Sequence, residues 1–278
     1  MRAGYKEVFL LMKAIILSAG QGRRLMPLTE VTPKCCLRPG GVSILEWQIT
    51  QLAVSGIDEV VVVTGFGHDA VEEVIDGIEG IKVRTLYNPF FRLSDNLGTC
   101  WVARGEMDAP FVLINGDTLF EAAVLQHLLT DAGHYPITLA TDQKISYDSD
   151  DMKIWSERDR LCRVGKTLDL SHVNGESIGM MVFSRAGGEI FCAKVEDLMR
   201  KGDGLKRWYL SAIDELAQTG VVGVSSIHGL SWCEVDDPVD LAHAVQVVKT
   251  WPIRPVKERA SKGLAEAPQQ SLGAYRKR

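Results

Sequence analysis

The sequence predicts an α/β fold in which a mixed, mostly parallel central sheet is flanked by helices. First, short apolar runs alternate with helix-like stretches across residues 13–133. Second, strand-like runs follow one another with few helices between them after Pro136, which indicates added antiparallel strands. Third, the sequence shows neither an internal repeat nor a clear linker, so we expect one elaborated domain.

These patterns give the expected elements in chain order. Ser43 with Glu46 three residues later has the pattern of a capping box and predicts the start of a helix. In the first half the strand-like runs are 13–18, 59–65, 81–87 and 110–116, and the helix-like runs are 44–56, 68–78, 96–106 and 121–133. The second half adds strand-like runs at 137–142, 151–156, 161–166 and 177–184, with helices near 187–219 and 238–249.

Composition limits the class of protein. The 278 residues are 46% hydrophobic, enough to bury a sizeable core. No apolar run approaches the roughly 20 residues that are needed to cross a bilayer. The apolar stretch near the start of the sequence is also too short for a secretory signal. We therefore expect no membrane insertion and a cytoplasmic location. Six cysteines without a CxxC pair predict reduced, mostly buried thiols.

The charge is negative overall but unevenly distributed. A formal net charge of −5 argues against a nucleic-acid binder. From Pro252 onward, seven Lys or Arg against two Glu give a local charge of +5. We interpret residues 251–278 as a basic, loosely ordered tail, either solvated or acting as an arm that binds a partner or wraps a second copy in a homodimer. Residues 1–12 are expected to form an N-terminal extension and residues 13–250 the domain itself.

The loop after the first predicted strand, which contains GQGRRL, is the first candidate binding site. Ligands of open parallel sheets lie beyond the carboxyl ends of the strands. Gly20 and Gly22 let backbone N–H groups approach a phosphate, and Arg23 and Arg24 add guanidinium groups suited to charged oxygens. A dinucleotide fingerprint would have a third glycine where Leu25 stands. The loop therefore predicts a ligand with more negative charge than a dinucleotide pyrophosphate.

A lysine and two carboxylates are expected at the same edge of the sheet. Lys34 lies at the far end of the loop, and Asp117 directly follows a predicted strand. Asp237 has the position of a helix N-cap before a proline, which leaves Asp236 free at a strand end. Two carboxylates that converge on a phosphate loop suit Mg²⁺.

A GKT tripeptide at 165–167 is not a P-loop, because Arg160 stands where that motif needs a glycine. Lys166 nevertheless ends a strand-like run, so it could meet a phosphate from the other half of the site. The alternative is a solvated lysine at a strand end.

These motifs together resemble the nucleotidyltransferases that make nucleotide sugars and related activated alcohols. The stretch 17–34 is similar to the signature loop of that family, and NGD at 115–117, GESIG at 175–179 and EVD at 234–236 follow in the family's order. With DDMKI at 150–154, the later motifs are most similar to the branch that uses CTP, which includes phosphocholine and phosphonate cytidylyltransferases.

The resemblance implies a single Rossmann-like (GT-A-like) domain that transfers CMP from CTP to a small phosphorylated or phosphonylated alcohol, with Mg²⁺ as cofactor and release of pyrophosphate. It implies that Arg24 binds the triphosphate, that Lys34 binds the reacting phosphate, and that Asp117 and Asp236 hold the metal. The residues it assigns to the acceptor are Lys166 and Glu176. The residues it assigns to the nucleotide are Leu17, Ala19, Gly20, Gly22, Arg23, Asn96 and Gly116.

The acceptor stays open at this point. The segment SDNLGTCW (94–101) lacks the doubled asparagine expected of phosphocholine enzymes, so choline, aminoalkylphosphonate, inositol and sugar phosphates all remain candidates. Trp208, Tyr209 and Trp232 offer rings that could face an ammonium group near the acceptor phosphate, with Trp232 as the acceptor-binding candidate. The alternative is that these rings pack in the core.

Three other functions are weighed against this one. A nicotinamide-dependent oxidoreductase is disfavoured because Glu46, about 20 residues past the loop, lies inside a predicted helix instead of at a strand end. A sugar-1-phosphate nucleotidyltransferase that uses UTP or dTTP is the nearest alternative. A non-catalytic regulatory nucleotide-binding module is disfavoured because a module without chemistry has no need for the complete set of charged residues named above.

Overall fold

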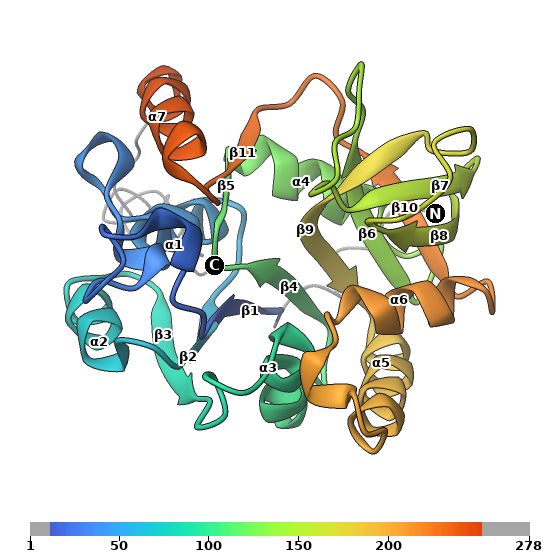
Figure 1. The fold of residues 1–278 in the computed structure, drawn as a ribbon, viewed down its shortest axis with the longest axis horizontal. Helices are drawn as coiled ribbons and strands as arrows, with labels where there is room; N and C mark the ends of the chain where they lie inside the picture. The colour runs from blue at the N-terminus through green and yellow to red at the C-terminus, as the bar shows by residue number, and fades with distance from the viewer. Residues whose placement is uncertain (1–11, 252–278) are drawn as a thin grey trace, which may run out of the picture.

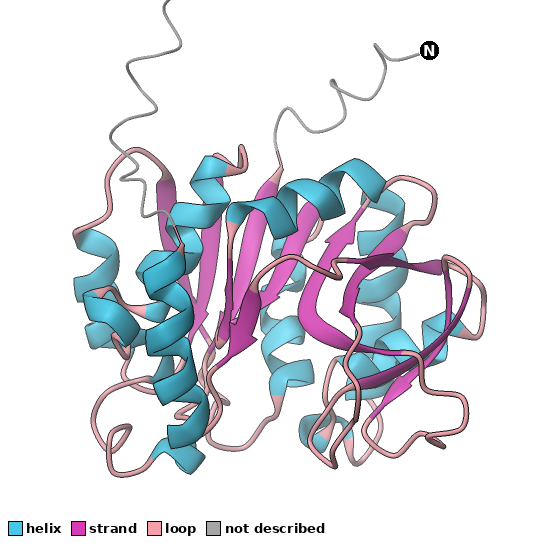
Figure 2. Ribbon diagram, turned by 90° about the horizontal axis from the view of Figure 1, so that it is seen from above, coloured by secondary structure: helices cyan, strands magenta, loops and turns pink. Residues whose placement is uncertain are grey.

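The computed structural model describes residues 12–251 and shows a sheet with helices on both faces (Figures 1 and 2). The strands are β1 (Lys13–Ser18), β2 (Glu59–Thr64), β3 (Lys82–Tyr87), β4 (Phe111–Asn115), β5 (Thr118–Phe120), β6 (Ile137–Asp142), β7 (Lys153–Glu157), β8 (Arg160–Gly165), β9 (Gly175–Phe183), β10 (Val222–Ser226) and β11 (Trp232–Glu234). The α-helices are α1 (Ile44–Val54), α2 (His68–Asp76), α3 (Asn96–Ala103), α4 (Ala122–Asp131), α5 (Arg185–Met199), α6 (Leu210–Ala217) and α7 (Pro238–Val247).

The main sheet has the order β3-β2-β1-β4-β9-β6-β10-β8-β7. β1 pairs in parallel with β2 and β4, and β2 pairs in parallel with β3. β9 runs antiparallel between β4 and β6, and β7 and β8 add further antiparallel pairs, while β10 is parallel to β6. The mixed sheet flanked by helices is the fold that the sequence predicts. Its parallel half brings the carboxyl ends of four strands to one edge.

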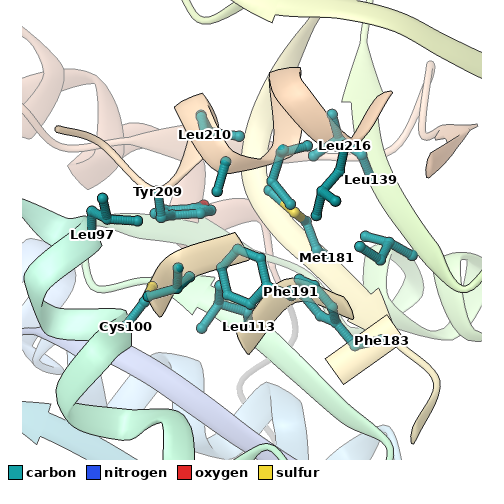
Figure 3. Packing of buried hydrophobic residues seen from close by; sticks show 14 of the residues in the cluster. Leu97, Cys100, Leu113, Leu139, Met181, Phe183, Phe191, Tyr209, Leu210 and Leu216 are labelled. Carbon is teal, nitrogen blue, oxygen red and sulfur yellow. The ribbon is translucent and has the colours of Figure 1, made fainter. Parts of the chain in front are cut away.

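Two apolar layers cover the two faces of the sheet. Along β1, Ala14 and Ile16 belong to one buried cluster and Ile15 and Leu17 to the other, as the two-residue period of a strand requires. Helices α1, α2 and α4 contribute to the first cluster, and α3, α5 and α6 to the second, part of which is drawn in Figure 3. Because every residue of β1 after Lys13 is buried, this strand holds the loop that follows it on a rigid base.

The predicted helix starts at Ser43 and Asp237 are confirmed. The Ser43 Oγ accepts the Glu46 N–H at 3.1 Å at the start of α1. At the start of α7, the Asp237 carboxylate accepts from two backbone N–H groups, with Pro238 in the first turn and the side chain of Asp240 completing a capping box. The capping function is thus performed by Asp237, and the carboxylate of Asp236 is available for other contacts.

The described range ends close to the predicted domain limits. Met12 and Trp251 are both buried, and the Trp251 ring lies 5.4 Å from that of Trp47 between centroids. The predicted extension and tail otherwise lie outside the described residues. All six cysteines are free thiols, and four of them are buried, as the sequence predicts. Within residues 12–251, we find no helix with the length and apolar character needed to span a membrane.

Candidate active site

The first loop, residues 19–33, follows the carboxyl end of β1 and contains both glycines of the GQG motif. Gly22 has a φ of 76°, a left-handed conformation that favours glycine, and a Cβ atom there would lie 2.8 Å from the Lys34 Cβ atom. A Cβ atom on Gly20 would meet nothing within 4 Å. Gly22 therefore allows Lys34 to pack against the loop, whereas Gly20 borders open space.

Lys34 joins two carboxylates at the centre of the site. Its Nζ atom lies 2.5 Å from Oδ2 of Asp117 and 2.8 Å from Oδ1 of Asp236, and its side chain is 16% exposed. Burial alone would lower the pKa of Lys34, but the two carboxylates outweigh burial and raise this pKa above its ordinary value. The lysine is therefore a fixed positive charge at the carboxyl edge of the sheet.

Two short strands bring Asp117 and Asp236 together. β5 pairs antiparallel with β11, so that Thr118 stands opposite Glu234. The Val235 N–H also donates to the Asp117 carbonyl oxygen at 3.2 Å. Two residues 119 positions apart in the sequence are thereby held at one point, one after β4 and one after β11.

The donor chemistry of this pair fits Mg²⁺. Oδ1 of Asp117 is buried and has no hydrogen-bond partner among residues 12–251. Mg²⁺ binds through one or two carboxylates, substrate phosphate oxygens and water. The described part of the chain contains no group of three or more His, Cys, Asp or Glu side chains that could hold a metal ion. Asp117 and Asp236 would therefore hold Mg²⁺ together with the phosphates of a substrate.

Arg24 extends the same charge cluster toward solvent. Its Nη2 atom lies 2.8 Å from Oδ2 of Asp236, and its Nη1 atom contacts Oδ2 of Asp150 at 2.5 Å. Burial would raise the pKa of Asp236, but Lys34 and Arg24 outweigh burial and lower this pKa. Asp236 is thus an ionised carboxylate between two cations.

Asp150 also contacts Lys166, which the sequence assigned to the acceptor. Lys166 Nζ lies 3.0 Å from Oδ1 of Asp150 and 4.8 Å from the centroid of the Trp208 ring. The hydrogen bond from Lys166 is the largest cause of the lowered pKa of Asp150, and Arg24 adds to it. One carboxylate on the connection between β6 and β7 therefore links Arg24 to Lys166. Asp150 is quoted within DDMKI in the sequence analysis but is given no role, because the motif does not indicate what this carboxylate contacts.

Two cavities meet at this cluster. The first, of about 240 Å³, is lined by all the predicted nucleotide-binding residues except Arg23, and by Lys34 and Asp117. The second, of about 280 Å³, is lined by Arg24, Asp236 and the predicted acceptor residues Glu176 and Trp232. The contact between Lys34 and Asp236 connects the two cavities. Arg23 lies apart from them and lines a neighbouring hollow of about 660 Å³.

The second cavity is acidic. Glu176 is buried at the start of β9, and the Lys144 Nζ atom lies 3.0 Å from its Oε2 and 2.6 Å from Oδ1 of Asp151. Burial raises the pKa of Glu176, although Lys144 opposes this shift. The Trp232 Nε1 atom donates to Oδ2 of Asp142 at 2.8 Å. The ammonium group of Lys144 is therefore held between the carboxylates of Asp151 and Glu176.

The three aromatic residues singled out in the sequence have different environments. Tyr209 is fully buried in the core shown in Figure 3, and its hydroxyl donates to Oδ1 of Asn115 at 3.0 Å. The Tyr209 ring therefore packs in the core, the alternative weighed for all three rings. Trp208 is partly exposed beside Lys166, and Trp232 lines the acidic cavity.

Glu234 is a further, half-buried acid, which the sequence analysis names in the EVD motif without giving it a role. Burial, together with the nearby carboxylates of Asp117 and Asp236, raises its pKa to about 8, against the opposing charge of Lys34. It lies in β11, two positions before Asp236. Its place in the EVD motif, at the end of the strand that leads to Asp236, was a usable signal.

Comparison with known proteins identifies the family to which the chain belongs. Residues 14–196 match the sequence model of a family described as the MobA-like NTP transferase domain. The chain belongs to this nucleotidyltransferase family. A CMP-5′-(3-aminopropyl)phosphonate synthase of Streptomyces rubellomurinus is 30% identical over 242 residues, which cover 84% of this chain and 38% of that protein. A bifunctional IPC transferase and DIPP synthase of Aquifex aeolicus is 25% identical over 240 residues, which cover 85% of this chain and 52% of that protein.

The nucleotidyltransferase chain thus spans about half the length, or less, of these curated relatives. Among solved structures, an inositol-1-phosphate CTP transferase from T. maritima superposes with a TM-score of 0.70 at 20% identity, covering 87% of this chain and 97% of that one. This likeness shows that the two proteins share a fold.

Proposed function

We propose that this protein transfers CMP from CTP to a small phosphorylated or phosphonylated alcohol, in a Mg²⁺-dependent reaction that releases pyrophosphate. The observation that carries the proposal is the Lys34–Asp236 contact, which joins a cavity beside the first loop to an acidic cavity lined by Arg24. A transfer between two phosphorylated molecules needs two such cavities with cations where they meet. The CMP-phosphonate product in the name of the Streptomyces relative supports the choice of CTP.

In the proposed reaction, an oxygen of the acceptor phosphate attacks the α-phosphorus of CTP. The new P–O bond forms as the bond from the α-phosphorus to the bridging oxygen breaks, and pyrophosphate leaves with that electron pair. No side chain needs to act as a nucleophile. The protein's task is to bring two anions together and to neutralise their charge, which is how positioned cations accelerate such steps.

The cations of the cluster divide this task. Arg24 binds the triphosphate, Lys34 the reacting phosphate, and Lys166 the acceptor phosphate. Each of them is paired with a carboxylate in the structure, so substrate phosphates take over contacts that Asp150 and Asp236 now make. When bound by Asp117 and Asp236, Mg²⁺ supplies further charge neutralisation at the phosphate oxygens.

For the acceptor, we propose a phosphate or phosphonate that also carries an amine. The acidic cavity supports this choice, because carboxylates outnumber cations in its lining and the Lys144 ammonium pairs, among residues 12–251, only with Asp151 and Glu176. The Trp232 ring in the same cavity could also face a cation.

The test is a panel of CTP, UTP, dTTP, ATP and GTP with Mg²⁺, in which pyrophosphate release is measured. Each nucleotide is offered phosphocholine, 2-aminoethylphosphonate, inositol phosphate or a hexose 1-phosphate. We expect a preference for CTP of about tenfold or more, since one well-placed base contact is worth that much, and a preference for the amine-bearing acceptors. The Trp232→Leu variant should then have a raised Michaelis constant for the best amine.

Other outcomes point elsewhere. A preference for UTP or dTTP with a hexose 1-phosphate would support the sugar-1-phosphate alternative. Nucleotide binding in a calorimeter without pyrophosphate release from any pair would support the regulatory module. Preference for inositol phosphate, with Trp232→Leu unchanged, would remove the amine from the proposal and leave the transfer of CMP in place.

A further inference from the structure

We propose that Lys153 is a positioning residue for the acceptor phosphate, because it holds the backbone of Lys166 and the backbone on both sides of Asp150. This inference rests on the proposed function, in which Lys166 binds the acceptor phosphate. Lys153 is the lysine of the DDMKI motif at 150–154, and neither the predicted site nor the proposed reaction gives it a role.

The Lys153 side chain is a buried cation that is held by backbone carbonyl groups. Lys153 is only 4% exposed. Its Nζ atom donates to the Asp148 carbonyl oxygen, to the Lys166 carbonyl oxygen at 2.9 Å and to the Asp151 carbonyl oxygen at 3.3 Å. These bonds use all three donors of an ammonium group, and we find no carboxylate in an ion pair with it among residues 12–251. Since burying a charge without hydrogen bonds is costly, these carbonyl groups are what allows a lysine here.

The three carbonyl groups belong to two segments that the proposed acceptor site needs. Asp148 and Asp151 lie on either side of Asp150, in the connection between β6 and β7, and Lys166 follows directly after β8. The side chains of Asp150 and Lys166 meet at 3.0 Å. The buried ammonium group therefore fixes, through the backbone, the positions of both partners of this ion pair.

Lys153 acts on the acceptor through its neighbours and not by contact. It is the first residue of β7, where it stands opposite Gly165 of β8 and Glu176 of β9. Gly165 precedes Lys166, and Glu176 lines the acidic cavity. Lys153 itself lines neither the acidic cavity nor the cavity beside the first loop. Its place between two strands that carry acceptor candidates is that of a positioning residue.

The bonds from Lys153 matter most when the acceptor binds. In the proposed reaction, the acceptor phosphate takes over the contact that Lys166 makes with Asp150. Because the Asp150 side chain is 62% exposed, this ion pair contributes little to holding the two segments together even before it is broken. The bond from the buried Lys153 ammonium to the Lys166 carbonyl oxygen does not depend on the Asp150 side chain. It therefore keeps Lys166 in place for the acceptor phosphate.

The experiment measures kcat and both KM values with the preferred nucleotide and with whichever of phosphocholine, 2-aminoethylphosphonate, inositol phosphate and a hexose 1-phosphate has the highest kcat/KM in the wild type. Lys153→Met keeps a long apolar side chain but has no donor. Its acceptor KM should rise about tenfold or more, the effect of one lost hydrogen bond to a charged group. Its nucleotide KM should stay near the wild-type value, because Arg24 keeps its contact with Asp236. Lys13→Met is the matched control, since Lys13 pairs with Glu106 at the opposite edge of the sheet and its loss should leave both KM values unchanged.

A double variant tests the route of the effect. Lys166→Met removes the side chain that Lys153 is proposed to position. If Lys153 acts through Lys166, adding Lys153→Met to Lys166→Met should raise the acceptor KM only slightly further. Full additivity of the two effects would overturn this route.

The two proposals fail in different ways. If Lys153→Met has an unchanged acceptor KM, and thermal unfolding shows only a lower stability, Lys153 is a structural residue and the proposed transfer of CMP stands. If the wild type releases no pyrophosphate with any pair, the transfer and the role of Lys153 are both wrong. Should Lys153→Met not fold, Lys153→Arg takes its place, because a planar guanidinium cannot direct three donors as an ammonium does. Its acceptor KM should also rise, and an unchanged value would contradict the positioning role.

Discussion

The two ends of the same parallel strands carry charge clusters of opposite character. At the amino ends, Lys13 of β1, Glu59 of β2 and Arg84 of β3 meet Glu106, which precedes β4. Arg84 lies 2.9 Å from Glu59 and 3.0 Å from Glu106 through separate nitrogen atoms, and Lys13 lies 3.2 Å from Glu106. At the carboxyl ends, Lys34 contacts Asp117 and Asp236, and Arg24 links Asp236 to Asp150.

The two clusters differ in whether their carboxylate oxygens have hydrogen-bond partners within the protein. At the amino ends, hydrogen bonds from Arg84 are the largest cause of the lowered pKa values of Glu59 and Glu106, so both carboxylates are satisfied. At the carboxyl ends, Oδ1 of Asp117 has no partner among residues 12–251, and burial together with neighbouring carboxylates raises the pKa of Glu234 to about 8. The carboxylates of the amino-end cluster are therefore paired within the protein, whereas the carboxyl-end cluster retains an unpaired, buried carboxylate oxygen.

The largest effect is expected from the carboxyl-end carboxylates. Asp117→Asn and Asp236→Asn should each reduce turnover by about a hundredfold or more, because removing a carboxylate weakens metal binding at the transferring phosphate. Pyrophosphate release at saturating substrate measures this loss. Asp237→Asn is the matched control, since asparagine also caps helices well and should leave turnover near the wild-type value. The reverse result at positions 236 and 237 would refute the metal assignment.

A smaller effect, on stability instead of activity, is expected at the amino ends. Arg84→Met leaves the half-buried Glu106 and Glu59 without their main donor. The free energy of unfolding should fall by about 1–2 kcal/mol, a figure reduced for solvent screening because about a third of the Arg84 side chain is exposed. Urea unfolding at neutral pH measures it, with turnover as the second measurement. A large loss of turnover in this variant would mean that the two clusters are not independent.

The smallest expected effect is a pH dependence of the stability that the amino-end cluster contributes. Glu59 and Glu106 have folded-state pKa values below their ordinary value of 4.5, so their contribution to stability is present above about pH 4.5 and is lost as the pH falls through the lowered values. Arg84→Met removes the main cause of that shift. The stability difference between wild type and variant should therefore shrink as the pH falls from about 5 to 3. A difference that stays constant over this range would contradict the assignment of the shift to Arg84.

The parts of the site that follow regular strands could be predicted from the sequence. An apolar run that ends at Asn115 places Asp117 at the sheet edge, and the capping pattern of Asp237 isolates Asp236. The contacts of Lys144 and Asp150 could not be predicted, because the connection between β6 and β7 has no periodicity and its position depends on the whole second half of the fold.

Two further features could not be predicted from the sequence. They are the pairing of two short strands and the different environments of two neighbouring aromatic residues. β5 and β11 have three residues each, too few to show a pattern, yet their pairing brings Asp117 and Asp236 together. Trp208 and Tyr209 are adjacent and similar in chemistry, but one is partly exposed and the other is fully buried. Only the packing of the start of α6 against α3 and β4 decides between them.

The Asp150 carboxylate affects which anions can bind to Arg24 and Lys166. Tethered between Arg24 and Lys166, it acts as an internal counterion at a high effective concentration. A weak monovalent anion from solution has to compete with this tethered group for each cation separately, and it gains little by replacing one carboxylate contact with another of equal charge. A ligand that carries several negative charges on one framework can replace both contacts at once. Occupancy of the cations should therefore rise steeply with the number of charges on the ligand, so that chloride and acetate are excluded while polyphosphates are retained.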